Sequence, residues 1–424
     1  MSFPEHRRTD VAIIGGGQAG LSVSYCLKQR GIHDHVIFER HRIGHSWRSE
    51  RWDSFCLVTP NFQCRLPGHP YDGDDPEGFM VKDEIVAYIE RYVAKVKPPI
   101  HEGVSVQSIE AHEDGFLVTT SECTWIAAQV VMAIGGFHKP IVPPGTENIP
   151  DSIFQIHSVA YRNPEQIPAG DIVVVGSGQS GCQIAEDLHL AGRKVHLCLG
   201  NAPRSPRQYR GKDVVAWLED MRYYDTPISA HPDPAMVRDS TNHYLTGRDG
   251  GREIDLRRFA LEGMGLYGYV DGIDEAGFSL RPNLKERLDA ADKSYVGIRK
   301  RIDEYIAAQG IDAPEEPVYE PCWQPEEEPQ RLDFSTKDVG AIIWSIGFRS
   351  DFSFVKFPIF DERGYPRYDR GVTEVPGLYF IGLPWLHTWG SGRFAGVGPD
   401  AEHLADQIHQ SLTRKPSPEL AGIV

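Results

Sequence analysis

Two copies of one glycine pattern constrain what this chain of 424 residues can fold into. In the first copy, the apolar run Val11–Ile14 leads into glycines at G-x-G-x-x-G spacing and then into a helical pattern. The first glycine of such a motif permits a tight turn, the second lets a pyrophosphate approach the backbone, and the third lets the helix pack close to the strand. The helix N-terminus adds free N–H groups. The residues expected to bind this dinucleotide are Gly15, Gly17, Gln18, Ala19 and Gly20.

An acidic residue stands where a dinucleotide site needs one. The segment His35–Glu39 predicts a second strand that ends in a carboxylate. A carboxylate roughly 20 residues after the first glycine can accept hydrogen bonds from a ribose diol. The alternative is that Glu39 is a surface residue and that the glycines serve packing alone. Because strand, turn, helix and acid agree, we expect Glu39 and its neighbour Arg40 to contact the cofactor.

The same pattern recurs after Asp171. The run Ile172–Val175 is again apolar, glycines follow at the same spacing, and a helical pattern comes next. A second strand, turn and helix in this order predict a second bound dinucleotide. The expected contacts are Gly176, Gly178, Gln179, Ser180 and Gly181.

The two copies differ at the end of their second strand. In the second copy that strand, Lys194–Leu199, leads to Gly200 rather than to a carboxylate, and Arg204 and Arg207 follow. Guanidinium groups can bind a 2′-phosphate, which a carboxylate would repel. The difference predicts FAD in the first site and NADPH in the second. The alternative for these arginines is a solvated or ion-paired face.

Other segments are expected to close around the cofactors. The strand patterns Val130–Gly136, Val339–Phe348 and Leu378–Gly382 contain or end in glycine, which lets backbone approach a bound dinucleotide. The loop Gly44–Asn61 carries aromatic and basic side chains directly after the first βαβ unit. The contacts expected from these segments are Trp47, Arg48, Trp52, Gly135, Gly347 and Gly382.

The glycine-rich segment Trp385–Gly398 is the expected place for a substrate. Ligands of such folds gather beyond the carboxyl ends of the strands, and this segment follows the strand pattern Leu378–Gly382. His387, Trp389 and Arg393 are side chains there that can donate hydrogen bonds or bind an anion. The alternative is that the first two pack the loop against the core and that Arg393 pairs with a surface acid.

The order of these elements predicts an α/β fold with two Rossmann-like dinucleotide-binding domains. The FAD-binding domain is expected to be discontinuous, with residues 1–150 and 338–424, and the NADPH-binding domain to span 151–337. Residues from about 212 to 333 exceed what a βαβ unit needs and predict a helical elaboration. Within it, apolar residues recur at helical spacing from Leu284 to Tyr305, which predicts one long amphipathic helix.

Composition narrows the partners. The net charge of −16 opposes binding to nucleic acid, and no apolar stretch is long enough to span a bilayer. Since no apolar leader precedes the first strand, we expect a cytoplasmic location. Seven cysteines without a C-x-x-C pair suggest neither a redox dithiol nor a disulfide framework. No metal site is expected, and a homodimer stays open.

The chain resembles the flavin-containing monooxygenases, and among them the plant YUCCA-like and related bacterial branch. The resemblance rests on the two glycine motifs, the loop Gly44–Pro67 and the strand Leu378–Gly382, in this order. Between the nucleotide motifs, His157 and Tyr161 match the second half of the motif that marks the family, whereas its first half is not matched. Tyrosine rather than tryptophan at position 161 favours this branch over the Baeyer–Villiger branch.

The resemblance implies an NADPH- and O2-dependent FAD monooxygenase. Its reaction would pass through a flavin C4a-hydroperoxide and transfer one oxygen atom to a small organic substrate, by N- or S-oxygenation or by oxidative decarboxylation of an α-keto acid. Asn61 stands near the position of the asparagine that the family carries beside the flavin. The expected catalytic residues are Asn61, His387, Trp389 and Arg393.

Two other classes stay open. One is an FAD-dependent NAD(P)H oxidoreductase or oxidase without oxygen transfer, and the other is a non-catalytic NADPH-sensing flavoprotein. A disulfide reductase would share both nucleotide sites, but it needs a dithiol that the sequence lacks. A sensing protein would not need the aromatic, glycine-rich segment Trp385–Gly398.

Overall fold

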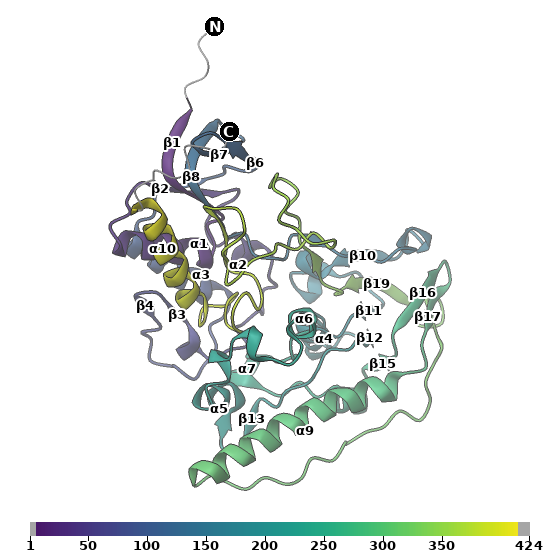
Figure 1. The fold of residues 1–424 in the computed structure, drawn as a ribbon. Coiled ribbons are helices and arrows are strands. Elements are labelled where there is room, and N and C mark those ends of the chain that lie inside the picture. The colour runs from purple at the N-terminus through teal and green to yellow at the C-terminus, as the bar shows by residue number, and fades with distance from the viewer. Residues whose placement is uncertain (1–5, 414–424) are drawn as a thin grey trace.

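The computed structural model describes residues 6–413 and contains two large sheets, each covered by helices, beside smaller ones (Figure 1). The first sheet has the order β5 (Ile100–Glu102), β2 (His35–Glu39), β1 (Arg7–Ile14), β8 (Thr124–Met132), β7 (Gly115–Thr120) and β6 (Val106–His112), and β21 (Leu378–Phe380) also pairs with β8. The second sheet has the order β10 (Phe154–His157), β19 (Val339–Trp344), β11 (Asp171–Val175), β12 (Val195–Cys198) and β15 (Gly265–Tyr267). The predicted α/β fold with two Rossmann-like units is confirmed.

Strand β1 is apolar along its whole C-terminal half because both of its faces are covered. Val11 and Ile13 pack into a cluster with residues of α1 (Gln18–Gln29), α3 (Lys82–Val96) and α10 (Val397–Thr413). Ala12 and Ile14 point the other way, into a cluster built from β7, β8, β21 and residues 352–359. Side chains alternate between the two faces of a strand, so a strand buried on both sides needs a continuous apolar run.

Strand β11 repeats this arrangement in the second sheet. Ile172 and Val174 pack with α4 (Gln179–Leu190), whereas Val173 and Val175 face a cluster that includes residues of the small sheet β16 (Val270–Asp274), β17 (Gly277–Leu280) and β18 (Arg331–Asp333). The two glycine turns therefore start from strands of the same kind, and each leads into a helix that covers its own sheet.

The predicted elaboration carries the remaining helices of the second unit. These are α5 (Val214–Asp220), α6 (Pro234–Asp239), α7 (Arg248–Gly251), α8 (Leu256–Leu261) and α9 (Leu284–Gln309). The long helix α9 confirms the amphipathic pattern, with Leu288, Tyr295 and Ile302 buried, and it runs along one side of the second unit (Figure 1). The segment is more than an elaboration, because β15 lies within it and forms the edge strand of the second sheet.

The predicted domain boundary at residue 338 is wrong. Strand β19 (Val339–Trp344) pairs in parallel with β10 and β11, so it belongs to the second sheet and not to the FAD unit. The chain returns to the first unit only afterwards, through β20 (Phe348–Arg349), which pairs with β9 (Lys139–Pro140). Both passages of the chain between the sheets therefore lie side by side.

Shorter elements complete the described part of the chain. They are α2 (His45–Ser49), the pairs β3 (Arg65–Leu66) with β4 (His69–Pro70) and β13 (Gln208–Tyr209) with β14 (Lys212–Asp213), and the 3-10 helices Asn61–Gln63, Thr146–Asn148, Ser158–Ala160, Pro164–Gln166, Tyr223–Asp225 and Ile228–Ala230.

Candidate active site

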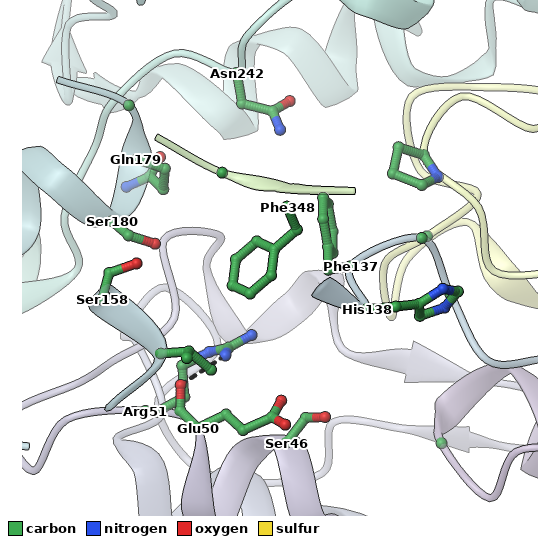
Figure 2. Close-up of a pocket in the computed structure, with 18 of the residues that line it drawn as sticks. Ser46, Glu50, Arg51, Phe137, His138, Ser158, Gln179, Ser180, Asn242 and Phe348 are labelled. Atoms are coloured by element: carbon green, nitrogen blue, oxygen red, sulfur yellow. Dashed lines mark hydrogen bonds between the residues drawn. The ribbon is translucent and has the colours of Figure 1, made fainter. Parts of the chain in front are cut away.

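One cavity of about 1330 Å³ lies between the two units and is lined by both glycine turns. Figure 2 shows side chains from both units around it, among them Arg51 from the first unit and Gln179 and Asn242 from the second. Most predicted cofactor contacts line this cavity. They are Gly15, Gly17, Gln18, Ala19, Glu39, Arg40, Trp47, Trp52, Gly135, Gly176, Gly178, Gln179, Ser180, Gly347 and Gly382.

The first glycine turn has the geometry that a pyrophosphate seat requires. Gly15 has φ +109°, and a Cβ there would lie 2.6 Å from the carbonyl oxygen of Ala133, so only glycine fits. A Cβ on Gly20 would overlap the carbonyl oxygen of Gly15, so this residue brings α1 close to the strand. A Cβ on Gly17 would meet no atom of the protein within 4 Å. The fold itself does not need a glycine at position 17, which leaves that space to a ligand.

The second turn repeats the first one position by position. Gly176 has φ +103°, and a Cβ there would lie 2.5 Å from the carbonyl oxygen of Ser345. A Cβ on Gly181 would overlap the carbonyl oxygen of Gly176. At Gly178 the nearest atom would be Thr241 Cγ2 at 3.8 Å, so this side is open as well. The N-cap residue of each helix, Gly17 or Gly178, is a glycine, so no side-chain hydrogen bond caps either helix. Their first N–H groups are therefore available to phosphates.

Backbone hydrogen bonds fix the Glu39 carboxylate at the cavity wall. Its two oxygens accept hydrogen bonds from the N–H groups of Gly16, at 2.8 Å, and of His41, at 2.9 Å. A carboxylate oxygen can accept more than one hydrogen bond, so the group keeps capacity for a ribose diol. The observed position fits the role that the sequence predicted for it.

Aromatic side chains form the wall of the cavity near the first turn. Trp47 stacks on Phe394 with ring centroids 5.5 Å apart and an angle of 22° between the planes. Trp52 is buried and packs edge-on against Phe55 at 5.1 Å. These rings provide flat apolar surface next to the glycine turns, which suits the rings of a flavin and a nicotinamide.

Comparison with known proteins identifies the family. The family described as pyridine nucleotide-disulphide oxidoreductase matches residues 12–294, more than half of the chain. The chain belongs to this family. The uncharacterized oxidoreductase CzcO-like of Geobacillus kaustophilus is 32% identical over 405 residues, a match that covers 94% of this chain and 98% of that protein.

Two further matches refine this assignment. The probable indole-3-pyruvate monooxygenase YUCCA4 of Arabidopsis thaliana is 26% identical over 204 residues, which cover 47% of this chain and 49% of that protein. The flavin-containing monooxygenase from Stenotrophomonas maltophilia shares the fold, with a TM-score of 0.67 at 19% identity and coverage of 96% and 99% of the two chains. The chain is thus an oxidoreductase. It resembles a flavin monooxygenase in its fold, which agrees with the predicted FAD and NADPH.

The structure contradicts the predicted role of Arg204 and Arg207 in this oxidoreductase. Arg204 is 2% exposed and forms ion pairs with Glu253, Asp255 and Asp292. Arg207 is 1% exposed and pairs with Asp213 at 2.6 Å. Neither side chain lines the cavity. The alternative of ion pairing was the right one, although the pairs are buried rather than solvated.

Arg48 and Asn61 also do not line the cavity. Arg48 pairs with Glu90 of α3 at 2.5 Å and so ties the loop to that helix. Asn61 is buried; its amide donates to the carbonyl of Asp75 at 2.9 Å and its side-chain oxygen accepts from the N–H of Met80 at 2.7 Å. The predicted cofactor contact of Arg48 and the predicted catalytic role of Asn61 are therefore wrong, since both side chains are used to hold loops.

The three residues predicted in the C-terminal segment differ in whether they line the cavity. Arg393 lines the cavity, whereas His387 and Trp389 do not. The Trp389 ring packs against Tyr224, with centroids 4.4 Å apart, and against the Arg393 guanidinium, 3.7 Å from its centroid. The His387 carbonyl accepts a hydrogen bond from the N–H of Ile228. His387 and Trp389 thus have packing roles, and only Arg393 of this group reaches the site.

Several residues that line the cavity were not predicted. They are Arg51 on the loop after α2, Phe137, His138 and Phe348 where the chain passes between the sheets, and Asn242 in the elaboration (Figure 2). Arg51 had a local signal, because it lies in the aromatic and basic loop that the sequence marks out. Asn242 had none, since only the folding of a distant segment brings it to the site.

The cysteines lie mostly in the core. Cys26, Cys56, Cys64, Cys182 and Cys198 are buried, and all seven cysteines carry free thiols. Burial raises the pKa of Cys56 to about 11 and that of Cys64 to about 12, so both remain protonated at neutral pH. Within residues 6–413, no group of side chains is arranged to hold a metal ion. None of the helices in that range has the length and apolar composition that crossing a bilayer requires.

Proposed function

We propose that this oxidoreductase is an NADPH- and O2-dependent monooxygenase that acts on a small organic substrate. One oxygen atom of O2 is added to the substrate, the other leaves as water, and NADPH is oxidised to NADP⁺ with uptake of one proton. The observation that carries the proposal is the single cavity shared by both glycine turns. A hydride donor and a flavin bound at these turns would share this cavity.

The residues of the chain bind and orient the two cofactors. The N-termini of α1 and α4 bind the two pyrophosphates, and Glu39 binds the ribose of the adenosine in the first unit. FAD, when bound, supplies the electron transfer and the activation of oxygen. Residues 1–150 and those after β20 form the FAD unit in this proposal, and the intervening residues form the NADPH unit.

The walls of the cavity protect the reaction from water. The Trp47–Phe394 stack and the buried Trp52 line the cavity on the side of the first turn. Phe137 and Phe348 pack edge to face at 5.9 Å where the chain passes between the units, and Phe137 is 65% exposed there, so this part of the wall is the open one (Figure 2). Apolar walls exclude water from reactive groups, which suppresses hydrolysis and the loss of reducing equivalents. His138 lies on this wall, and burial lowers its pKa, so it faces the cavity as a neutral ring at pH 7.

The buried thiols disfavour a disulfide reductase. Such an enzyme needs an accessible thiolate beside a second thiol, whereas Cys56 and Cys64 are buried with raised pKa values. The similarity to a probable indole-3-pyruvate monooxygenase makes an α-keto acid one substrate class to test, beside amines and sulfides. The experiment below distinguishes an oxidase, which transfers no oxygen to a substrate, from a monooxygenase.

The test is a substrate screen of the purified protein with NADPH under air. For each compound, NADPH consumption and peroxide release are measured together, and the oxygenated product is identified by mass spectrometry with ¹⁸O2. We expect at least one compound for which NADPH consumption exceeds peroxide release and one ¹⁸O atom enters the product. If peroxide release equals NADPH consumption with every amine, sulfide and α-keto acid, the protein is an oxidase instead. If NADPH does not reduce the flavin, the protein is a non-catalytic NADPH-sensing flavoprotein.

A further inference from the structure

Buried arginines in this chain are paired with carboxylates. Arg204 contacts three carboxylates, Arg207 pairs with Asp213, and Arg257 pairs with Asp289 and Asp292. A buried guanidinium needs such partners, because an unpaired charge in a protein interior is strongly unfavourable. An arginine that departs from this rule is therefore informative.

Arg393 is half-buried at the cavity wall and has no such partner within residues 6–413. One of its Nη atoms donates to the side-chain oxygen of Asn242 at 2.8 Å and the other to the carbonyl oxygen of Trp389, and both acceptors are neutral. Among the described residues, no carboxylate forms an ion pair with it. Burial lowers the pKa of Arg393 to about 10, which still leaves it charged at pH 7. A positive charge without a counter-ion thus faces the cavity.

The guanidinium is held in one orientation. Its Cζ lies over the ring of Trp389, 3.7 Å from the centroid, and Tyr224 packs against the same tryptophan with ring centroids 4.4 Å apart. Asn242 fixes one edge of the group. Stacking of this kind leaves in-plane N–H groups free to bind an anion and removes much of the entropy cost of ordering the side chain on binding.

Arg393 also lies between the two nucleotide turns. The carbonyl of its neighbour Gly392 accepts a hydrogen bond of 3.2 Å from Gln18 at the start of α1. On the other side, the segment of Asn242 is tied to α4, where Gln179 accepts a hydrogen bond of 3.3 Å from the N–H of Leu245. The Trp47–Phe394 stack begins at the next residue. Charge and apolar surface therefore meet between the starts of the two helices.

We propose that Arg393 binds the carboxylate of a substrate whose remaining body is aromatic or otherwise apolar. This assignment rests on the proposed monooxygenase function and names its substrate class. The carboxylate pairs with the free edge of the guanidinium, and the apolar body lies against the aromatic wall. The protein as a whole is negatively charged and repels anions from most of its surface. The Arg393 cation in the cavity therefore attracts small anions to this site.

The first experiment compares two sulfides of nearly the same shape. Thioanisole is neutral, and 4-(methylthio)benzoate carries a carboxylate; kcat/KM for sulfoxide formation is measured for each with saturating NADPH. We expect Arg393→Met to lower kcat/KM for the benzoate about ten- to a hundredfold more than kcat/KM for thioanisole, as loss of a charge-assisted contact does. Arg393→Lys should retain part of the preference. Arg258→Met, at an exposed position on α8, is the matched control.

The second experiment does not depend on oxygen transfer. Benzoate is titrated into the oxidised holoenzyme without NADPH, and binding is followed by the visible flavin spectrum. We expect saturable binding that weakens about ten- to a hundredfold in Arg393→Met at unchanged FAD content. Asn242→Ala provides a second variant and should weaken binding less, since it removes only one support of the guanidinium.

The outcomes separate the two proposals. Benzoate binding that depends on Arg393, without oxygenation of any sulfide, would leave the anion site standing and overturn the monooxygenase function. Oxygenation of thioanisole with equal kcat/KM losses for both sulfides would leave the function standing and overturn the anion site.

A higher KM for NADPH in Arg393→Met, with benzoate competing against NADPH, would assign the charge to a cofactor phosphate. Loss of benzoate binding in Arg51→Met alone would also overturn the assignment.

Discussion

The carboxylate of Glu39 and the backbone N–H of Gly16 are joined by a hydrogen bond of 2.8 Å. This bond ties the end of β2 to the glycine turn that follows β1, so the ribose seat and the pyrophosphate seat are fixed relative to each other. A change at Glu39 therefore acts on both.

Glu39→Arg is expected to reduce FAD binding about ten- to a hundredfold, because it removes a charged acceptor of the ribose diol and the support of the turn. The measurement is the ratio of flavin to protein absorbance after purification and after dialysis. Glu110→Arg, at an exposed position on β6, is the control and should keep its flavin. Full occupancy in Glu39→Arg would show that another residue holds the ribose.

Gly178→Ala and Gly181→Ala should fail in different ways. At Gly178 the added methyl group meets no protein atom closer than 3.8 Å, so the fold is kept and NADPH, whose space it takes, should bind about tenfold or more weakly. At Gly181 the methyl group overlaps the Gly176 carbonyl, so we expect a loss of about 1–3 kcal/mol in stability. Thermal unfolding and the KM for NADPH distinguish the two. Similar values for both variants would contradict the assigned geometry of the turn.

Arg204→Ala should destabilise the protein rather than change its choice of cofactor. Removing it leaves Glu253, Asp255 and Asp292 without their partner, and breaking a buried pair of this kind costs about 3–5 kcal/mol. Thermal unfolding should show the loss, while the ratio of kcat/KM for NADPH and NADH stays unchanged. The surface variant Arg222→Ala, whose pair with Asp225 is exposed, should be nearly neutral. A selective loss of NADPH activity would restore the phosphate role.

Glu186 should make stability depend on pH. Its side chain is buried on α4, 3.4 Å from Arg252, and burial raises its pKa to about 7. The folded state therefore binds the proton more tightly than the unfolded state, and the stability this gives is lost as the pH rises toward 7. Glu186→Gln removes the charge, so relative to the original protein it should gain roughly 2–3 kcal/mol between pH 5 and pH 8.

The measurement is the thermal midpoint of both proteins at several pH values in that range. The difference between them should widen up to about pH 7 and then level off, since Glu186 is ionised in both states above that pH. Glu110→Gln on the surface of β6 serves as the control. Parallel curves for Glu186→Gln and the original protein would contradict the raised pKa.

The sequence predicted the parts of the site that depend on local order. Gly15, Gly17 and Gly20 act within one turn, so strand, turn and helix reveal them together, and the same holds for Gly176, Gly178 and Gly181 in the second copy. Glu39 could be found because it ends the strand next to that turn. In each case the residues that define the geometry lie close together in the chain.

The wrong predictions concern residues whose surroundings come from distant parts of the chain. Arg204 lies near the end of β12, as the rule for a 2′-phosphate suggests, but Glu253, Asp255 and Asp292 come from distant segments and bury it. Asn61 is likewise held by Asp75 and Met80 across a loop. An arginine that meets a phosphate and one that meets a carboxylate look alike in a sequence, since guanidinium binds both. Only the fold decides between them.

The pairing of β9 with β20 limits how the two units can move. Both connections between the units pass through this short ladder, which is extended by a hydrogen bond from the N–H of Ile141 to the Gly347 carbonyl and by the ion pair of Lys139 with Asp351. A single linker would permit swivelling in every direction, whereas two linkers bonded to each other favour bending about one axis. Ion pairs of Arg65 with Glu219 and of Arg363 with Asp239 also join the units, so the bonded linkers are one of several restraints that keep the two glycine turns facing the same cavity.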